Sequence, residues 1–394
     1  MFSFHKSATA LLAVATLAGC ASLSPDGNQT DINTLTAGKT AGINAPVGRG
    51  DSAETREEVA RLLAGPLSAE SAVRIALLNN PGIHASMAAL GISDADRVRA
   101  GTLPNPHFSI GRFVEGRKVE IERGIGFSVI GLLTLPWRAK YQSQQHEVVK
   151  LQAAQEVVKL AADTRKAWIT AVAAQQTASY MKDAKEAAEA SGELARRLAR
   201  VGNWSKLQQA QVQLAQSSAK MNVRRAQNAA TQAEASLIKT LRLTGMHSAV
   251  ALPDRLPDVP VQALSPQALD GRVAAIAAQL PRAEGMRNGA NARLARQAYL
   301  SSHALAVSAR EEVLKVREFI TEETVLHYNG MLKSVWDLLG EVSSQSQAVA
   351  SAIEAQRDFC IAETDLQWVL QGGAPDSFVS LGGGGGEPAA AAGH

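Results

Sequence analysis

The feature that most constrains the fold is an unbroken helical pattern from Arg138 to about Arg200. It covers about 62 residues, which corresponds to about 93 Å at a rise of 1.5 Å per residue. A compact domain does not need a helix of this length. We therefore expect an extended rod.

A second helix follows the rod after a short break. The break at Val201-Gly202-Asn203 precedes Ser205, a candidate N-cap, and the next helical pattern runs to about Leu243. Small and branched apolar residues recur every three or four positions along it, which favours close packing of antiparallel helices: Val212, Ala215, Ala219, Val223, Ala226, Ala230, Ala233, Leu237 and Leu241. The region 138–243 is predicted to be a helical hairpin with its tip at Gly202.

The same order of elements occurs twice. A short helical segment broken at Pro81 opens a first repeat over 67–245, and a weaker copy broken at Pro281 opens a second repeat over 267–371. A proline-rich linker, 246–266, separates them. The second repeat has a helical pattern on each side of a turn at Gly330, which corresponds to Gly202. Such an internal duplication determines the architecture.

A different periodicity lies inside the first repeat, at 107–130. Apolar and polar residues alternate in the run 119–130, which follows 107–114 and the segment Glu115–Lys118, and the two runs predict a β-hairpin with strands of about 8 and 12 residues. A tilted strand needs about 9–11 residues to cross a bilayer, and an apolar and a polar face are typical of outer-membrane barrels. Arg123 interrupts the apolar face. The pattern alone also fits a hairpin on a soluble domain.

The N-terminal sequence predicts export and lipid attachment. Residues 1–19 carry Lys6, then an apolar run, and the run Leu-Ala-Gly ends at Cys20. This resembles the lipobox of bacterial lipoproteins, in which the cysteine carries a covalent lipid. Ala21 then favours the outer membrane. The alternative is an ordinary secretory signal. We expect 20–66 to be a flexible tether and 372–394 a disordered tail.

Nothing in the sequence suggests catalysis. The net charge of +3 is too small to indicate nucleic acid as a partner. The histidines are scattered without metal-ligand spacing, and no phosphate-binding glycine loop precedes a helix. Cys360 is expected to pack inside a helical segment. We therefore expect a protein that is not an enzyme, with no metal and no cofactor apart from the lipid on Cys20.

The ordered region, about 67–372, resembles the TolC-type outer-membrane efflux proteins. The similar segments are Ala72–Ile83, Leu103–Pro106, Leu133–Arg138 and the two tips that begin at Ala199 and Leu326. The resemblance implies a mainly α fold, with long antiparallel helical hairpins as a duplicated unit and one membrane-type β-hairpin. It also implies passive export of small molecules or metal ions by a homo-oligomer, a trimer in that family. Its implied partners are outer-membrane lipid, a periplasmic adaptor and an inner-membrane pump.

The resemblance gives roles to the tips and to one carboxylate. Residues at both tips would contact the adaptor: Arg200, Gly202, Trp204, Tyr328, Gly330 and Trp336. The alternative is that the glycines allow a left-handed helix end and the aromatic residues cap the hairpins. Asp337 lies near the position where family members carry a constricting carboxylate, but it is one residue off the usual spacing. A solvated helix position is the alternative there.

The second repeat departs from the family, because no period-two segment interrupts its helices. A trimer would then supply six strands, below the eight of the smallest bacterial barrels. An open sheet edge in lipid leaves backbone groups unpaired. Three solutions remain open: a higher oligomer, a partner chain that supplies strands, or a lipid-anchored structural protein that interacts with envelope partners and does not conduct.

Overall fold

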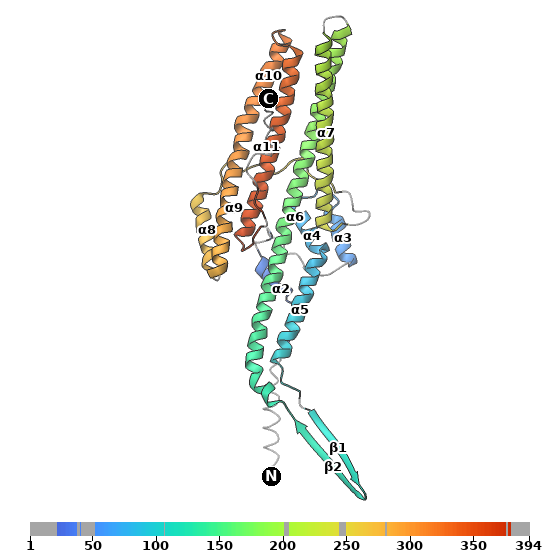
Figure 1. The fold of residues 1–394 in the computed structure, drawn as a ribbon, viewed down its shortest axis with the longest axis vertical. Coiled ribbons are helices and arrows are strands. Elements are labelled where there is room, and N and C mark those ends of the chain that lie inside the picture. Colours follow the sequence, from blue (N-terminus) through green and yellow to red (C-terminus); the bar gives the residue numbers. More distant parts are fainter. Residues whose placement is uncertain are drawn as a thin grey trace, which may run out of the picture. The chain divides into compact units, whose positions relative to one another are not determined.

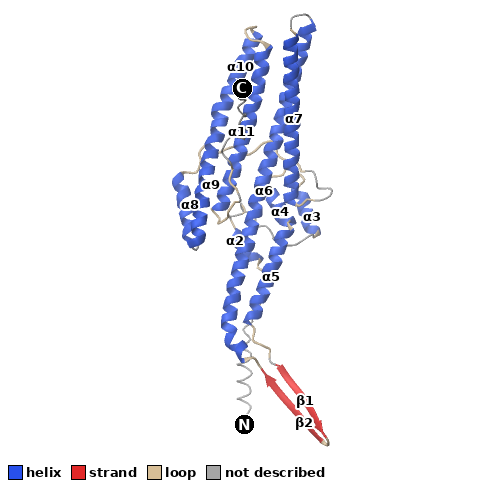
Figure 2. Ribbon diagram, viewed as in Figure 1, coloured by secondary structure: helices blue, strands red, loops and turns tan. Residues whose placement is uncertain are grey.

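The structure is a computed structural model that describes residues 22–37, 40, 52–105, 107–200, 205–243, 250–279, 282–375 and 377–379. Helices dominate these residues, and one pair of strands is present among them (Figures 1 and 2). The mainly α fold with one β-hairpin is therefore confirmed. The chain divides into two compact units, and the boundary in the long helix falls between Glu156 and Val157.

Unit 1 contains Pro81–Glu156 and the N-terminal segment that ends at Thr36. Helix α5 (Pro81–Gly101) leads to strand β1 (His107–Glu115), which pairs with β2 (Lys118–Gly126). The first part of α6 (Val129–Arg200) returns alongside α5 in the opposite direction, since Ser86 near the start of α5 bonds Glu156. The short α2 (Gln29–Thr36) lies beside α6, where Asp31 pairs with Lys150 at 2.8 Å.

Unit 2 contains the first helical hairpin, formed by the rest of α6 and by α7 (Lys206–Leu241). The two helices are antiparallel: Gln216 donates to the carbonyl of Ala188 at 3.4 Å, and Lys220 pairs with Glu189 at 3.7 Å. Two short helices, α3 (Ala53–Leu62) and α4 (Ala69–Asn79), pack with this hairpin. This confirms the predicted rod and its return helix.

The second hairpin, also in unit 2, follows α8 (Pro266–Gln279). Helix α9 (Arg282–Ser308) continues through a π-helical stretch, η2 (Ala309–Leu314), into α10 (Lys315–Asn329), and α11 (Val335–Val369) returns. Arg317 pairs with Glu341 at 3.0 Å across this hairpin. The sequence predicted uninterrupted α-helix here. The structure adds a π-helical segment, which local propensity does not reveal.

Equivalent aromatic anchors mark the duplication in unit 2. The indole nitrogen of Trp168 donates a 2.7 Å hydrogen bond to the carbonyl of Leu67, just before α4. The hydroxyl of Tyr299 accepts a 3.2 Å hydrogen bond from the amide of Leu264, just before α8. The two partners are 101 residues apart in the first repeat and 35 in the second. The second repeat therefore lacks 66 residues between equivalent anchors.

Two predicted boundaries near the hairpin were wrong. The hairpin ends at Gly126 rather than at 130, and α6 begins at Val129 rather than at Arg138. Ser128 explains both, because its hydroxyl accepts the amide of Gly131 and its carbonyl accepts the amide of Leu132. Pro136 is the eighth residue of α6, beyond the first turn, so its missing amide hydrogen removes the helical hydrogen bond to the carbonyl of Leu132.

The segments predicted to be flexible contain structure where they are described. Helices α2 and α3 lie within the predicted tether 20–66, and Val59 of α3 is buried in the core of unit 2. In the predicted tail 372–394, Phe378 packs against that core. Leu252 and Leu256 of the linker also belong to this core. The prolines of the linker prevent a helix, but they do not keep its leucines out of the core. The composition of these segments did not predict the contacts, because each contact is made by a single apolar side chain within a mostly polar or proline-rich stretch.

Candidate functional site

The β-hairpin turns over two residues, Gly116 and Arg117. Gly116 has φ of +61°, a conformation that glycine adopts without steric cost, and Arg117 follows it with an ordinary negative φ. Such a glycine-first turn suits a tight hairpin and fixes the pairing register. His107 pairs with Gly126, and Glu115 pairs with Lys118.

This register gives the hairpin one apolar face. Phe108 lies opposite Ile125, and Val114 lies opposite Val119, with all four side chains more than half exposed. Two arginines sit between these pairs on the same face: Arg112 opposite Ile121, and Arg123 opposite Ile110. The sequence identified Arg123 as an interruption. Arg112 was missed because its face depends on the register.

The other face of the hairpin carries mostly small or polar side chains, with Phe113 as a large apolar exception. It carries Ser109 opposite Gly124, Gly111 opposite Glu122 and Phe113 opposite Glu120. The two faces of the ribbon therefore differ in the way that separates a lipid-facing surface from a water-facing surface in a membrane barrel.

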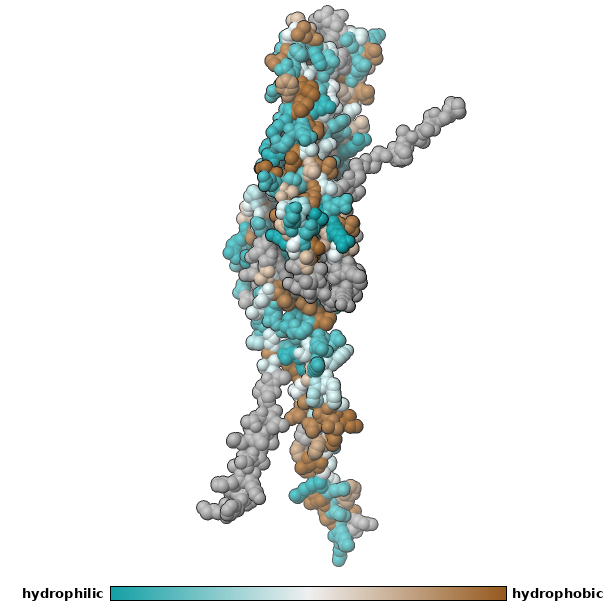
Figure 3. Space-filling view, turned by 90° about the vertical axis from the view of Figure 1, so that its left-hand side faces the viewer, coloured by the Kyte–Doolittle hydropathy of each residue, from teal (hydrophilic) through white to brown (hydrophobic). Residues whose placement is uncertain are grey.

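Exposed apolar side chains continue from the hairpin into the first turns of α6. Figure 3 shows apolar surface gathered in this region of unit 1. Ile130, Trp137 and Tyr141 are 76%, 74% and 60% exposed. They belong to one stripe of α6 with steps of three, four and seven residues, which we call the α6 stripe: Ile130, Leu133, Trp137, Tyr141, Val148 and Leu151. The spacing of these residues can be read from the sequence, but the exposure of their side chains cannot.

None of the helices in the described parts of the chain is long and apolar enough to cross a bilayer.

The N-terminal segment is held against α5 by a buried carboxylate. Asp94 is 2% exposed and accepts the amide of Ser24 at 2.8 Å and the guanidinium of Arg97 at 2.6 Å. Burial opposes its charge, but these hydrogen bonds outweigh burial and hold the pKa of Asp94 below its usual value. Arg97 also donates to the carbonyl of Ser22 at 3.3 Å. Cys20 lies outside the described residues.

His146 is buried beside this carboxylate. Its Nδ1 has no hydrogen-bond partner among the described atoms, and the side chain is 4% exposed. Burial lowers the pKa of His146, and Lys150 and Arg97 lower it further, against the opposing effect of Asp94 and Glu147. The ring is therefore most stable in its neutral form.

The helix ends that lead into the two hairpin tips lie at the same end of unit 2 (Figure 1). Arg200, the last residue of α6, is exposed and lies 3.8 Å from Glu193. Tyr328 is half-buried near the end of α10, and Gly330 follows that helix. Gly202, Trp204 and the side chain of Trp336 lie outside the described part, so their predicted adaptor contacts stay predictions.

The left-handed residue of the second tip is not the glycine. Gly330 has φ of −78°, whereas Met331 has φ of +58°. The expectation that Gly330 supplies a left-handed helix end was therefore wrong. Hydrogen bonds from Leu332 and Lys333 to the carbonyl of His327 close the turn around Met331.

Asp337 forms the start of α11. Its carboxylate accepts the backbone amide of Ser334 at 2.9 Å, and the Ser334 hydroxyl accepts the Asp337 amide, so the pair is a capping box. The hydrogen bonds from Ser334 lower the pKa of Asp337. This contact gives Asp337 a structural role that does not depend on a channel constriction.

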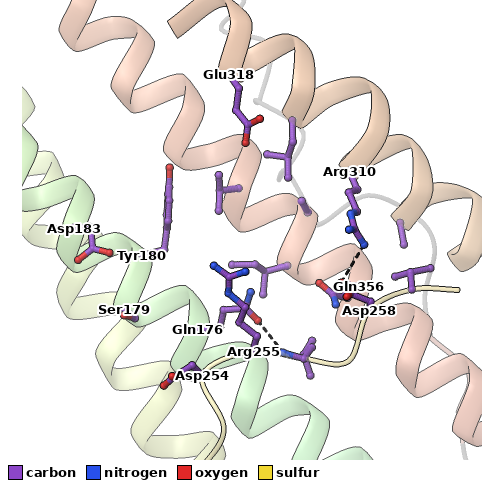
Figure 4. Close-up of a pocket in the computed structure, with 17 residues that line it drawn as sticks. Gln176, Ser179, Tyr180, Asp183, Asp254, Arg255, Asp258, Arg310, Glu318 and Gln356 are labelled. Atoms are coloured by element: carbon purple, nitrogen blue, oxygen red, sulfur yellow. Dashed lines mark hydrogen bonds and ion pairs between the residues drawn. The ribbon is translucent and has the colours of Figure 1, made fainter. Parts of the chain in front are cut away.

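A polar cavity of about 630 Å³ lies inside unit 2, between α6, the linker and the second hairpin (Figure 4). Arg310 points from the π-helical segment to Asp258 and donates a hydrogen bond of 3.1 Å to its carboxylate. Tyr180 lines the same cavity from α6. Burial, followed by the charges of Glu318 and Asp183, raises the pKa of Tyr180. In the described parts of the chain, no group of His, Cys, Asp and Glu side chains could hold a metal ion.

Solved structures with a similar fold are outer-membrane channels. They include CusC, at 12% identity and a TM-score of 0.56 over 77% of this chain and 91% of that one. They also include CmeC of Campylobacter jejuni, at 12% identity and 0.53 over 83% and 87%, respectively. The open state of MtrE of Neisseria gonorrhoeae matches at 14% identity and 0.53 over 77% and 88%. No protein-family model and no curated protein matches the chain in sequence. The fold of this chain is that of the TolC-type outer-membrane channels.

Proposed function

We propose that this protein is the outer-membrane component of an efflux system, which lets small molecules or metal ions leave passively through an oligomeric channel. The observation that carries the proposal is the β-hairpin of unit 1, with its exposed apolar face and its polar opposite face, on a fold shared with outer-membrane channels. In a membrane barrel the apolar face would contact lipid and the polar face would line water. Passive conduction needs no catalytic group.

The lipid on Cys20 would anchor the chain at the outer membrane. One residue separates Cys20 from Ser22, whose carbonyl accepts Arg97, so the lipid would lie close to the end of α5. Replacing Cys20 with alanine should abolish labelling by radioactive palmitate and reduce the membrane-bound fraction. Labelling that survives the substitution would contradict lipidation at this cysteine.

The two tips would receive a periplasmic adaptor that connects to an inner-membrane pump. Exposed Arg200 and Gly330 and half-buried Tyr328 offer a mixed polar and aromatic surface there, and Gly202, Trp204 and Trp336 complete the proposed set. Tyr328→Ala should weaken adaptor capture in a two-protein cross-linking assay. His327→Ala, one residue earlier and exposed, is the matched control.

Single-channel recording tests the function directly. The full-length lipidated protein, extracted in detergent and added to a planar bilayer, should give discrete open-channel currents. A stable, lipidated and correctly folded protein without currents would reject the channel.

The second repeat favours one alternative. Its anchors are 35 residues apart instead of 101, so it supplies no strands within the described residues. A chain with half the strands of a channel could be a non-conducting lipoprotein that binds envelope partners through its helices. The same recording separates the two functions.

A further inference from the structure

The polar cavity of unit 2 takes no part in the function proposed above, yet its frame is well fixed. The linker lines it, and three successive linker residues each bond a different helix: Leu256 to Gln176 of α6 at 3.3 Å, Pro257 to Gln356 of α11 at 2.7 Å, and Asp258 to Arg310 of η2 at 3.1 Å. Its volume of about 630 Å³ lies within the range of small-molecule sites, about 300–1,000 Å³. A ligand would therefore enter a preformed cavity.

The floor of this cavity is apolar. Leu256 of the linker, Ala306 of α9 and Ile353 of α11 line it and are buried. Leu314 of η2 and Val349 of α11 add further apolar lining. Hydrocarbon that packs on such side chains leaves water, which favours binding. The floor therefore favours a ligand with a hydrocarbon part.

The charged groups that line the cavity do not cancel. Four are carboxylates and two are guanidinium groups: Asp183, Asp254, Asp258 and Glu318, with Arg255 and Arg310. Arg310 pairs with Asp258, whereas the other three carboxylates have neither an ion pair nor a hydrogen bond with any described residue. Arg255 extends from the linker into the cavity (Figure 4). Two negative charges remain in excess, which favours a ligand with two positive charges.

The three unpaired carboxylates lie on different elements. Asp183 is on α6, Glu318 on α10 and Asp254 on the linker. They do not converge as metal ligands, since no group of acidic, histidine and cysteine side chains in the described parts of the chain could hold a metal ion. Asp183 and Glu318 both act electrostatically on half-buried Tyr180, so both lie near its ring. Asp254 provides a second place for a positive charge.

One helix is irregular where it lines the cavity. Arg310 and Leu314 lie in the π-helical stretch η2, and π-helical turns occur frequently at functional sites. The corresponding helix of the first repeat, α6, is continuous α-helix from Val129 to Arg200. The irregularity therefore does not belong to the duplicated architecture. It is specific to the second repeat, where it shapes the cavity wall.

We propose that this cavity binds an aliphatic diamine with both amino groups protonated. One ammonium group lies against the ring of Tyr180, where Asp183 and Glu318 attract it. The other ammonium group lies at Asp254, and the methylene chain between them covers the apolar floor. The site is formed within one chain and does not depend on conduction.

Isothermal titration calorimetry with diamines of different length tests the site. The full-length protein, extracted in detergent, is titrated at constant ionic strength with unbranched diamines from 1,3-diaminopropane to 1,8-diaminooctane, and with hexylamine and Mg²⁺. Saturable binding with a maximum affinity at one chain length is expected, because both ammonium groups must reach their carboxylates. Hexylamine should bind more weakly, and Mg²⁺ should not compete. No saturable binding, the same affinity at every length, or equal competition by Mg²⁺ would overturn the proposal.

Substitutions of opposite sign separate binding from damage to the fold. Glu318→Gln and Asp183→Asn should each weaken the affinity by up to about fivefold, as expected for one exposed ion pair. Arg255→Gln removes a positive charge from the cavity and should strengthen the affinity. Glu322→Gln, exposed one turn further along α10 and outside the lining, is the matched control. Equal weakening by Glu318→Gln and Glu322→Gln, or weaker binding in Arg255→Gln, would contradict the site.

The outcome is independent of the channel. Binding is measured on extracted protein, so a protein that binds the diamine without giving currents would reject only the channel. A conducting protein that does not bind any diamine would reject only this site.

Discussion

The indole nitrogen of Trp168 donates a hydrogen bond of 2.7 Å to the carbonyl oxygen of Leu67, 101 residues earlier in the chain. Both residues are buried, and the contact fixes the long helix α6 to the segment that starts α4. At the equivalent place of the second repeat the direction is reversed, because the Leu264 amide donates to the hydroxyl of Tyr299. The duplication is thus visible as an aromatic side chain that is hydrogen-bonded to the backbone just before a short helix in each repeat.

Trp168→Phe should lower the free energy of unfolding of unit 2. The substitution leaves the Leu67 carbonyl without its donor, which costs about 1–3 kcal/mol, and the smaller ring adds a cavity. Urea denaturation followed by circular dichroism measures the change. Trp137→Phe is the matched control, because Trp137 is 74% exposed and has no comparable bond. Equal effects of both substitutions would show that the bond does not stabilise the fold.

Asp94→Asn should release the N-terminal segment from α5 within unit 1. The carboxylate accepts Ser24 and Arg97 in a buried position, and loss of such charged hydrogen bonds costs about 1.5–3 kcal/mol. Hydrogen exchange of residues 22–37 should then accelerate. Asp96→Asn, two residues on at a more exposed ion pair of 3.6 Å, should leave the exchange unchanged. Protection that persists in Asp94→Asn would contradict the anchoring role.

The same segment should loosen as the pH falls from 7.5 to 5. His146 faces Asp94 and Arg97 of α5 and Glu147 and Lys150 of α6, and Lys150 in turn pairs with Asp31. Burial depresses the pKa of His146 while the N-terminal segment is bound. The neutral ring therefore contributes to the stability of the bound segment above the ordinary histidine pKa of about 6.5. This stabilisation is lost as the pH falls through the lower pKa that His146 has while the segment is bound.

Hydrogen exchange of residues 22–37 at several pH values checks this expectation. In His146→Gln the protection factors, which compare each exchange rate with that of an unstructured peptide at the same pH, should no longer change between pH 7.5 and 5. The carboxylate of Asp94, whose pKa is also depressed, loses its contribution only at more acidic pH. A pH dependence that is the same with and without His146 would assign it to other groups.

Two substitutions at Asp337 separate its capping role from a constriction. Asp337→Ala removes the acceptor for the Ser334 amide and should destabilise the start of α11. Asp337→Asn keeps an acceptor oxygen and removes the charge. If the residue constricts the channel, Asp337→Asn should change single-channel conductance or cation preference. Unchanged currents in a stable Asp337→Asn protein would reject the constriction and leave helix capping as the role of Asp337.

Periodicity in the sequence predicted the elements that depend on local pattern. The long rod, its return helix, the hairpin and its turn at Gly116 all follow from spacing and from turn residues. The absence of a second hairpin from the second repeat also follows, and it holds for the part of the chain that the structure describes.

Contacts between distant residues could not be predicted in the same way. The start of α6 depends on the Ser128 cap, which overrides an alternating pattern that continues to Ile130. The fixed N-terminal segment depends on Asp94, 70 residues from Ser24. The left-handed conformation of Met331 is equally hidden, because the sequence places a glycine beside it that would be the usual choice.

The most direct test of membrane insertion is the accessibility of the hairpin to lipid-soluble and water-soluble quenchers. Spin labels on single cysteines at Ile110, Ile125 and Glu122 are compared in the full-length protein in lipid vesicles, with exposed Leu207 at the start of α7 as the water reference. Insertion predicts that labels at positions 110 and 125 respond mainly to oxygen and the label at 122 to a nickel chelate. Equal access of the nickel chelate to positions 110, 122, 125 and 207 would contradict a membrane-crossing hairpin.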